Sequence, residues 1–304
     1  VGSIIGESVG DFIGDVICDL FGYEDANYTE STRYDPLVLD LDGDGFELLS
    51  VKDGVYFDAD MKGLAEKTEW IAADDAVLAI DLNEDGIIND GSELFGTSTK
   101  LANGRLASNG FQALAQYDLN KNGVIDENDE VFGKLKVWQD RNGDGVSQED
   151  ELYSLRDLNV ENISLVTSND EGHLTANINY KDGSVTKIGE FHFAYESYNT
   201  KEKECIEISE EIADLPDIRA IGNVKSLHTL MQLDATGTLK EYVERFSAAA
   251  SRQEKEEIVT SILYFITGAD AVSSGSRGSL MDAQKLTVVE QFMGRGYNGR
   301  AGAN

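Results

Sequence analysis

Five short segments of the sequence combine closely spaced acidic or amide residues with a glycine. They read DLDGDG, DADMKG, DLNEDG, DLNKNG and DRNGDG, and they begin at Asp40, Asp58, Asp81, Asp118 and Asp140. A calcium loop of the EF-hand type needs oxygen ligands at its positions 1, 3 and 5, a glycine at 6, a main-chain carbonyl at 7 and an acid at 12. The repeats therefore predict calcium as the cofactor, with up to about five bound ions.

The last two loops match this pattern best. The loop from Asp140 matches at every position, and the loop from Asp118 ends on an aspartate, whose shorter side chain can offer a single oxygen. Between them, Val131, Leu135 and Trp138 are spaced as on one face of a helix, which predicts two EF-hand-like loops sharing a middle helix. The predicted ligands are Asp118, Asn120, Asn122, Val124, Asp126 and Asp129 in one loop, and Asp140, Asn142, Asp144, Val146, Gln148 and Glu151 in the other.

The other three loops depart from the pattern. The DLNEDG loop has its acid, Glu93, at position 13, so it must be one residue longer. In the DADMKG loop, Lys62 brings a positive charge to position 5. The DLDGDG loop has a valine at position 12, so its distal acid must come from elsewhere, with Glu47 and the Asp58 region as candidates. The predicted ligands are Asp40, Asp42, Asp44, Asp58, Asp60, Glu69, Asp81, Asn83, Asp85, Ile87, Asn89 and Glu93.

An Asp35-Pro36 dipeptide stands directly before the first acidic loop. An aspartate carboxyl can attack its own main-chain carbonyl to close a five-membered anhydride, and the tertiary-amide nitrogen of proline is then the leaving group. Such an attack gains an effective molarity of roughly 10⁵ to 10⁸ M if the geometry is held. Asp40 is four residues beyond Pro36, so calcium capture there could set that geometry. The acid that protonates the Pro36 nitrogen is either a nearby carboxyl with a raised pKa or Asp35 itself.

Charge limits the possible partners. The chain has 304 residues, with 25 Lys and Arg against 57 Asp and Glu, and a formal net charge of −32. Nucleic acid is excluded as a partner because phosphate binding needs clustered basic residues. A run of apolar residues long enough to span a membrane is absent from the sequence. Repulsion among so many carboxylates opposes compaction, so cations are expected to assist folding.

The sequence divides into four parts. Residues 1–35 hold glycines at four-residue spacing, a glycine-zipper-like helix, and a linker; residues 36–195 hold the acidic loops and end in strand-like alternation. A polar linker, 196–215, precedes helical periodicity over 216–304. The predicted fold class is α+β: EF-hand-like calcium loops on short helices with a small antiparallel sheet, followed by an all-α helical domain. We expect the whole to be part of a larger polypeptide.

Several of these stretches are specific enough to suggest a family. The chain resembles the self-processing module of Frp and Apx-type RTX proteins, which are exported by type I secretion, over roughly 35–299. The resemblance rests on YDPLVLDLDGDGFEL, VYFDAD, DLNEDGIINDGSELFG and YDLNKNGVIDENDEVFGKLKVWQDRNGDGVSQEDEL. It implies calcium-triggered cleavage of an Asp-Pro bond in a secreted, extracellular protein, with Asp35 as acyl donor, Pro36 as leaving residue, and a Lys amine as acceptor in an isopeptide bond.

Two other functions remain as alternatives to a single-turnover autoproteolytic module. One is a non-catalytic, calcium-stiffened structural or adhesion module in which Asp35-Pro36 is only a linker turn. The other is a calcium sensor, which would need Met-rich apolar grooves. The sequence contains four Met in all, none concentrated near the paired loops, so the sensor is disfavoured.

Overall fold

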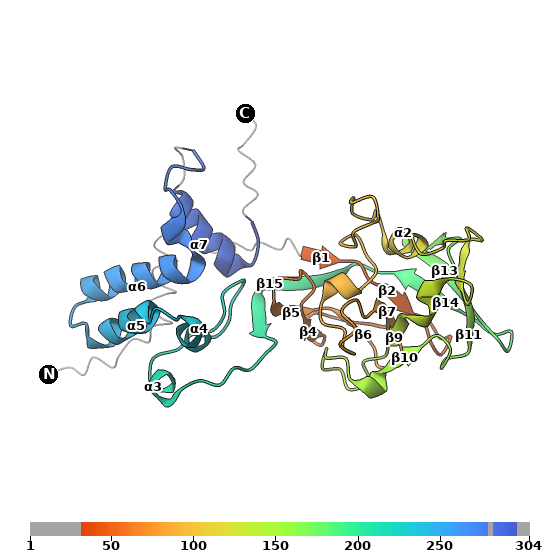
Figure 1. Cartoon of the computed structure of the whole chain (residues 1–304), viewed down its shortest axis with the longest axis horizontal. Helices are drawn as coiled ribbons and strands as arrows, with labels where there is room; N and C mark the ends of the chain where they lie inside the picture. Colours follow the sequence, from red (N-terminus) through yellow and green to blue (C-terminus); the bar gives the residue numbers. More distant parts are fainter. Residues whose placement is uncertain (1–31, 279–281, 297–304) are drawn as a thin grey trace. The chain divides into compact units, whose positions relative to one another are not determined.

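The computed structural model of the chain describes residues 32–278 and 282–296. The chain divides after Glu196 into two compact units, of which the first carries most of the strands and the second most of the helices (Figure 1). The expected helix over residues 1–21 and Cys18 lie outside the described residues. Cys205 is exposed and its thiol is free.

The first unit is built from antiparallel strands. Nine strands form the larger sheet, in the order β10-β9-β7-β2-β14-β13-β11-β8 with β12 beside β13, and a smaller sheet has the order β1-β15-β5-β4. The larger sheet comprises β2 (Leu37–Leu39), β7 (Ala76–Ile80), β8 (Val124–Asp126), β9 (Leu135–Trp138), β10 (Leu152–Ser154), β11 (Val160–Ser164), β12 (Ser168–Asp170), β13 (His173–Tyr180) and β14 (Val185–Glu190). The smaller sheet comprises β1 (Thr32–Tyr34), β4 (Val55–Phe57), β5 (Leu64–Thr68) and β15 (Phe193–Glu202), and β3 (Leu48–Leu49) pairs with β6 (Trp70–Ile71).

Strands β2 and β7 lie at the middle of the larger sheet, and every residue in them is buried. Because side chains alternate along a strand, Leu37 and Leu78 pack into one hydrophobic core while Val38 and Val77 pack into the other, on the opposite face. The second core is rich in aromatic rings, among them Tyr34, Phe57, Trp70, Trp138 and Phe193. A strand buried on both faces explains why the LVL and AVLAI segments are continuously apolar.

The chain passes from one sheet to the other at Asp35-Pro36. Strand β1 ends at Tyr34 and pairs with β15, whereas β2 begins at Leu37 and pairs with β7 and β14. Tyr34 packs edge-on against Phe193, with ring centroids 5.4 Å apart. The two residues between these strands are therefore held from both ends.

The predicted fold class is wrong, because the first unit is mostly antiparallel β structure and most of its acidic loops follow strands rather than helices. The segment expected as the shared middle helix is η2 (Glu130–Gly133) followed by β9, which pairs with β7 and β10. In so short a segment, three apolar residues at i, i+4 and i+7 fit either a helix or a strand with a neighbour on each side. Pairing with the distant strands β7 and β10 makes this segment a strand. The described helices of this unit are α2 (Gly110–Ala115) and short 3₁₀ turns. The strand-like alternation at the end of residues 36–195 forms an antiparallel hairpin, in which β13 pairs with β14.

The second unit contains α3 (Glu210–Ala213), α4 (Leu227–Leu233), α5 (Thr238–Ala248), α6 (Arg252–Thr267) and α7 (Ala283–Met293). Helix α6 begins after Ser251, whose side chain caps it by accepting from the Glu254 N–H. The prediction of a separate all-α domain is wrong. Helices are a minor part of the chain, and the unit includes the end of β15, where the Ser197 hydroxyl donates to the Met293 carbonyl at 2.6 Å.

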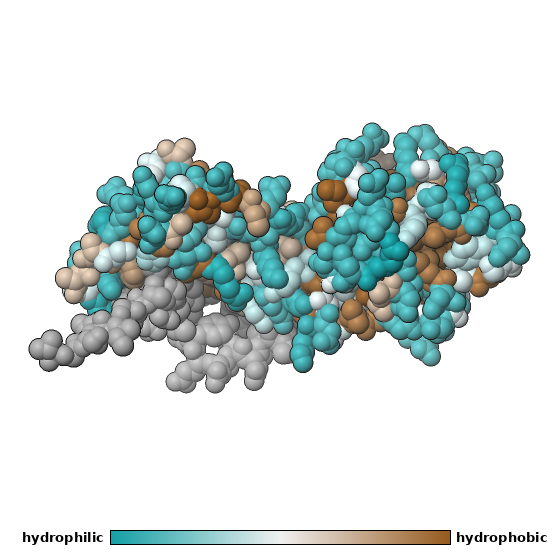
Figure 2. Space-filling model, turned by 90° about the horizontal axis from the view of Figure 1, so that it is seen from below, coloured by the Kyte–Doolittle hydropathy of each residue, from teal (hydrophilic) through white to brown (hydrophobic). Residues whose placement is uncertain are grey.

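Hydrophilic side chains cover most of the face shown in Figure 2, with apolar residues scattered among them. Within the described ranges, the helices are too short or too polar to cross a membrane. The segment 196–215, expected as a linker, contains the end of β15 and α3.

Candidate functional site

Asp35 is buried, with 4% of its surface exposed, and its carboxylate is held by one residue of a neighbouring loop. The Thr97 N–H donates to both carboxylate oxygens at 3.0 Å, and the Thr97 hydroxyl donates to Oδ1 at 2.6 Å. A carboxylate bound by two donors of one residue has a fixed direction. The side chain of Asp35 is therefore oriented within the fold, which an aspartate in a solvated linker would not be.

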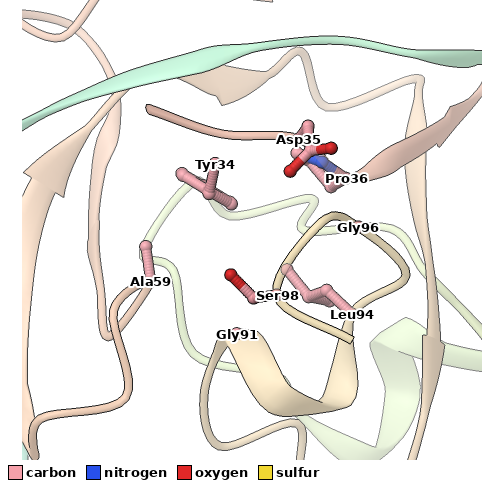
Figure 3. Close-up of a pocket in the computed structure, with 8 residues that line it drawn as sticks. All are labelled: Tyr34, Asp35, Pro36, Ala59, Gly91, Leu94, Gly96 and Ser98. Atoms are coloured by element: carbon pink, nitrogen blue, oxygen red, sulfur yellow. The ribbon is translucent and has the colours of Figure 1, made fainter. Parts of the chain in front are cut away.

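The loop that carries Thr97 also approaches the main chain of Asp35 closely. A β-carbon added to Gly96 would lie 2.8 Å from the Asp35 carbonyl oxygen. Beside it is a small cavity of about 10 Å³, roughly the space of one water molecule, lined by Tyr34, Asp35, Pro36, Ala59, Gly91, Leu94, Gly96 and Ser98 (Figure 3). Asp35, on whose carbonyl an anhydride would form, is thus buried beside a space of about one water molecule.

Replacing Gly96 by alanine should slow any reaction at the Asp35 carbonyl by about 10-fold to 100-fold, because a displacement of about 1 Å can cost that much. The methyl group must push the Thr97 loop or the carbonyl away. Gly133→Ala is the matched control, since its added carbon meets only the Arg156 side chain at 3.6 Å. The measurement is the rate of chain cleavage after calcium addition, and equal rates in the two variants would show that this close approach is unimportant.

A second carboxyl group contacts Asp35. Glu190, the last residue of β14, is buried with 5% of its surface exposed, and its carboxyl interacts with that of Asp35. The Gly110 N–H, at the start of α2, donates to Glu190 Oε1 at 2.7 Å. Burial, and then the nearby Asp35 carboxyl, raise the pKa of Glu190 to about 7. The candidate site therefore contains a pair of carboxyls beside Pro36.

The Asp81, Asp118 and Asp140 loops close in one common way. In each, the first aspartate accepts from the N–H groups at positions 5 and 6, and the last acid accepts from those at positions 2 and 9. The donors to the last acid are Leu82 and Asn89 for Glu93, Leu119 and Asp126 for Asp129, and Arg141 and Gln148 for Glu151, at 2.6 to 3.4 Å. These bonds turn the loop side chains inward, as a cation site requires. The extra residue in the Asp81 loop does not alter its closure.

The residues between these two acids complete each loop. Asn83 and Asp85, Asn120 and Asn122, and Asn142 and Asp144 accept N–H groups two residues onward in their own loops, including those of Ile87, Val124 and Val146. Two of the loops are also linked, since the Ile88 N–H donates to the Ser147 hydroxyl at 2.7 Å. The structure thus connects the Asp81 loop to the Asp140 loop, whereas the sequence paired the Asp118 loop with it.

The Asp40 loop takes its remaining acids from beyond its own length. Asp40, Asp42 and Asp44 offer carboxylate oxygens within 4.8 Å of one another. The carboxyl of Glu47 interacts with that of Asp44, and the Glu47 N–H donates to Asp75 at 2.9 Å. Glu47 is one of the candidates from the sequence; Asp75, which comes directly before β7, is a residue that sequence reasoning missed. Burial first, and then the charges of Glu47 and Asp40, raise the pKa of Asp75 to about 7.

Of the two later acids that are in register in the Asp58 loop, Glu66 and Glu69, the structure brings Glu66 to it. Asp58, Asp60 and Glu66 lie together, with carboxylate oxygens within 4.8 Å of one another. Glu69 does not join them, because it accepts from the Ala194 N–H of β15 at 2.8 Å. Lys62 forms an ion pair with Asp60 at 2.6 Å. Burial first, and then Asp60 and Asp58, raise the pKa of Glu66 to about 8.

These two loops fit a divalent cation. Three of the described carboxylates have a buried oxygen without a hydrogen-bond partner: Glu47 Oε2, Asp60 Oδ1 and Asp75 Oδ1. A buried carboxylate oxygen without a partner is costly, and a hard cation with oxygen ligands would satisfy it. The raised pKa values of Glu66 and Asp75 have burial as their first cause, and the neighbouring acids add to it.

The acidic loops connect directly to the residues that hold Asp35. Glu93 closes the Asp81 loop within η1 (Gly91–Glu93), and the chain runs on through Leu94 to Gly96 and Thr97. The Gly91 N–H donates to the Asp58 carbonyl at 2.9 Å, which joins the Asp58 loop to the same turn. The Asp58 and Asp81 loops are thus both bonded to the turn that leads to Thr97.

Comparisons with known proteins agree with this architecture. The SPM domain family matches residues 37–195, a range that begins directly after Pro36. Over 241 residues, 76% of this chain, the sequence is 34% identical to "Iron-regulated protein FrpA" of Neisseria meningitidis serogroup C. The aligned part spans about a fifth of that relative's length (21%). The resemblance seen in the sequence is thereby confirmed at the level of the family: the chain belongs to the SPM domain family.

Proposed function

We propose that this chain cuts its own Asp35-Pro36 peptide bond once calcium fills the acidic loops. The observation that carries the proposal is the buried Asp35 carboxylate, held by Thr97 at the point where the chain passes between two sheets. A dipeptide that served only as a linker turn would need neither burial nor a fixed carboxylate. The fold supplies both at the one aspartate of the sequence that precedes a proline.

The reaction is an intramolecular acyl transfer. A carboxylate oxygen of Asp35 bonds to the Asp35 carbonyl carbon, the bond from that carbon to the Pro36 nitrogen breaks, and the nitrogen takes a proton. The product is a five-membered anhydride on the N-terminal part and a free Pro36 amine on the C-terminal part. Water opens the anhydride to leave two carboxyls on Asp35; a Lys amine opens it to an isopeptide bond.

Calcium acts at a distance from the bond in this proposal. Closing the Asp58 and Asp81 loops around ions orders η1 and the Gly96–Thr97 segment, which orients the Asp35 carboxylate. Loops of extracellular modules commonly bind calcium at roughly 10⁻⁴ to 10⁻³ M, far above cytosolic levels. The cut would then follow export, in keeping with the proposed secretion of an RTX-type protein.

A calcium jump followed by intact-mass analysis tests the proposal. We expect two fragments, 1–35 and 36–304, whose masses add up to the chain plus one water, and some cross-linked species at high protein concentration. A matched sample with excess chelator should stay intact. If the chain folds in saturating calcium yet remains whole, the alternative of a calcium-stiffened structural module holds instead.

A further inference from the structure

We propose that Glu190 is the acid that protonates the Pro36 nitrogen, and that before the cut its carboxyl shares that proton with the Asp35 carboxyl. The inference rests on the proposed cleavage and names a residue for the step that the sequence leaves open. Glu190 is separated from Asp35 by most of the module in sequence, and only the pairing of β14 with β2 brings the two together.

Register places Glu190 beside the bond. Glu190 lies opposite Leu37 in the β14-β2 pair, and the next N–H, that of Phe191, donates to the Pro36 carbonyl at 3.3 Å. The Gly110 N–H holds the side chain at Oε1, and the Asp35 carboxyl lies near it. The register of β14 thus places Glu190 next to Pro36, the residue whose nitrogen is the leaving group.

The two carboxyls must divide one proton between them. Two carboxylates buried beside each other repel, so one of the pair keeps its proton. Thr97 donates two hydrogen bonds to Asp35, whereas Glu190 is buried with the single N–H of Gly110 and its pKa is raised. Asp35 is then the nucleophile and Glu190 the acid, two carboxyls with roles set by their surroundings.

The step balances with these groups alone. The Asp35 carboxylate forms the new carbon–oxygen bond, the carbon–nitrogen bond to Pro36 breaks, and the proton of Glu190 goes to the departing nitrogen. Glu190 is left as a carboxylate and Pro36 as a secondary amine. No other reactant is consumed until water or a Lys amine opens the anhydride.

The rate should fall as pH rises through about 7, because Glu190 then loses the proton that it must donate. Few other titratable groups face it. Asp35 contacts it from the entry to β2, His173 on β13 places Nδ1 3.2 Å from the Glu190 main-chain oxygen, and α2 carries no charged residue. Both neighbours can be tested separately.

The experiment follows calcium-triggered cleavage of the full chain in wild type, Glu190→Gln, His173→Asn and the exposed control Glu161→Gln, from pH 5.5 to about 8.5. Glutamine keeps the shape of Glu190 but cannot deliver an acidic proton, so we expect cleavage to be about 10² to 10⁴ times slower. The control and His173→Asn should keep the wild-type fall in rate at alkaline pH. Near-UV circular dichroism with calcium checks that each variant folds.

Outcomes separate this inference from the proposed function. Wild type that never cuts overturns the proposed function itself. Wild type that cuts while Glu190→Gln cuts within threefold of it overturns only the role of Glu190. The wild-type pH profile needs no variant: a rate that is flat or still rising above pH 7 would also rule out Glu190 as the donor, and loss of the alkaline fall in His173→Asn would assign it to the histidine.

Discussion

Asp35→Ala should leave the chain whole under calcium conditions that cut the wild type. The substitution removes the only carboxyl that can close a five-membered ring on that carbonyl, and with it an effective molarity of roughly 10⁵ M or more. Asp35→Glu would have to close a six-membered anhydride with its carboxyl displaced from Thr97, so it should react slowly at best. Intact-mass analysis over time measures both rates.

The control for this prediction is the calcium-bound fold. Trp70 and Trp138 are fully buried, with ring centroids 5.1 Å apart, and their near-UV circular dichroism reports whether the module has packed. Asp35→Ala should give the wild-type signal with calcium and yet no fragment. If it is cut at the same bond as fast as wild type, the attack does not come from Asp35 and the anhydride mechanism is wrong.

Without calcium, the first unit should lose its fixed tertiary packing, and it should regain it cooperatively as calcium is added. The chain carries a net charge of −32, and five divalent ions would reduce it to −22, with the neutralised charge placed where acids are densest. Far-UV and near-UV circular dichroism with chelator and with millimolar calcium measures the change. Identical spectra in both conditions would contradict calcium-dependent folding.

Asp140→Ala should abolish or greatly slow cleavage, because losing this loop should also loosen the packing around the distant Asp35 site. Asp140 is buried and accepts from the Gly145 N–H at 2.9 Å and from the Trp70 indole at 2.7 Å, so it joins its loop to the aromatic core. Asp270→Ala, in an exposed residue of the second unit, removes the same charge and should cut normally. Normal kinetics in Asp140→Ala at saturating calcium would make this loop peripheral.

The loops could be predicted from sequence because their closure is local. The acids that close the Asp81, Asp118 and Asp140 loops lie within 13 positions of the first ligand, so spacing alone identifies Glu93, Asp129 and Glu151. The Asp40 and Asp58 loops were predicted less completely. Asp75 reaches the first through a turn before β7, and Glu66 rather than Glu69 joins the second because β5 turns the latter toward β15.

The sheets and the Glu190 contact could not be predicted in the same way. Nothing around Glu190 distinguishes it from other acids in alternating strands, and its relation to Asp35 depends on which strands pair. The spacing of the apolar residues that end at Trp138 predicts a helix, but the same spacing also fits a short strand, which is what the segment forms. The conformation of a loop can be predicted from residues close together in sequence, whereas the order of strands in a sheet depends on pairing between distant segments.

The pairing of β1 with β15 means that cutting the bond and separating the pieces are different events. A chain severed after Asp35 would still be held by three residues of strand pairing and by Tyr34 packed against Phe193. The activated end would therefore stay docked in a shielded place while it waits for an amine. Pairing over three residues is weak, so dissociation of the N-terminal fragment would compete with attack by a Lys amine. The lifetime of the paired β1 strand would then decide whether the protein ends as two fragments or as an isopeptide-linked product.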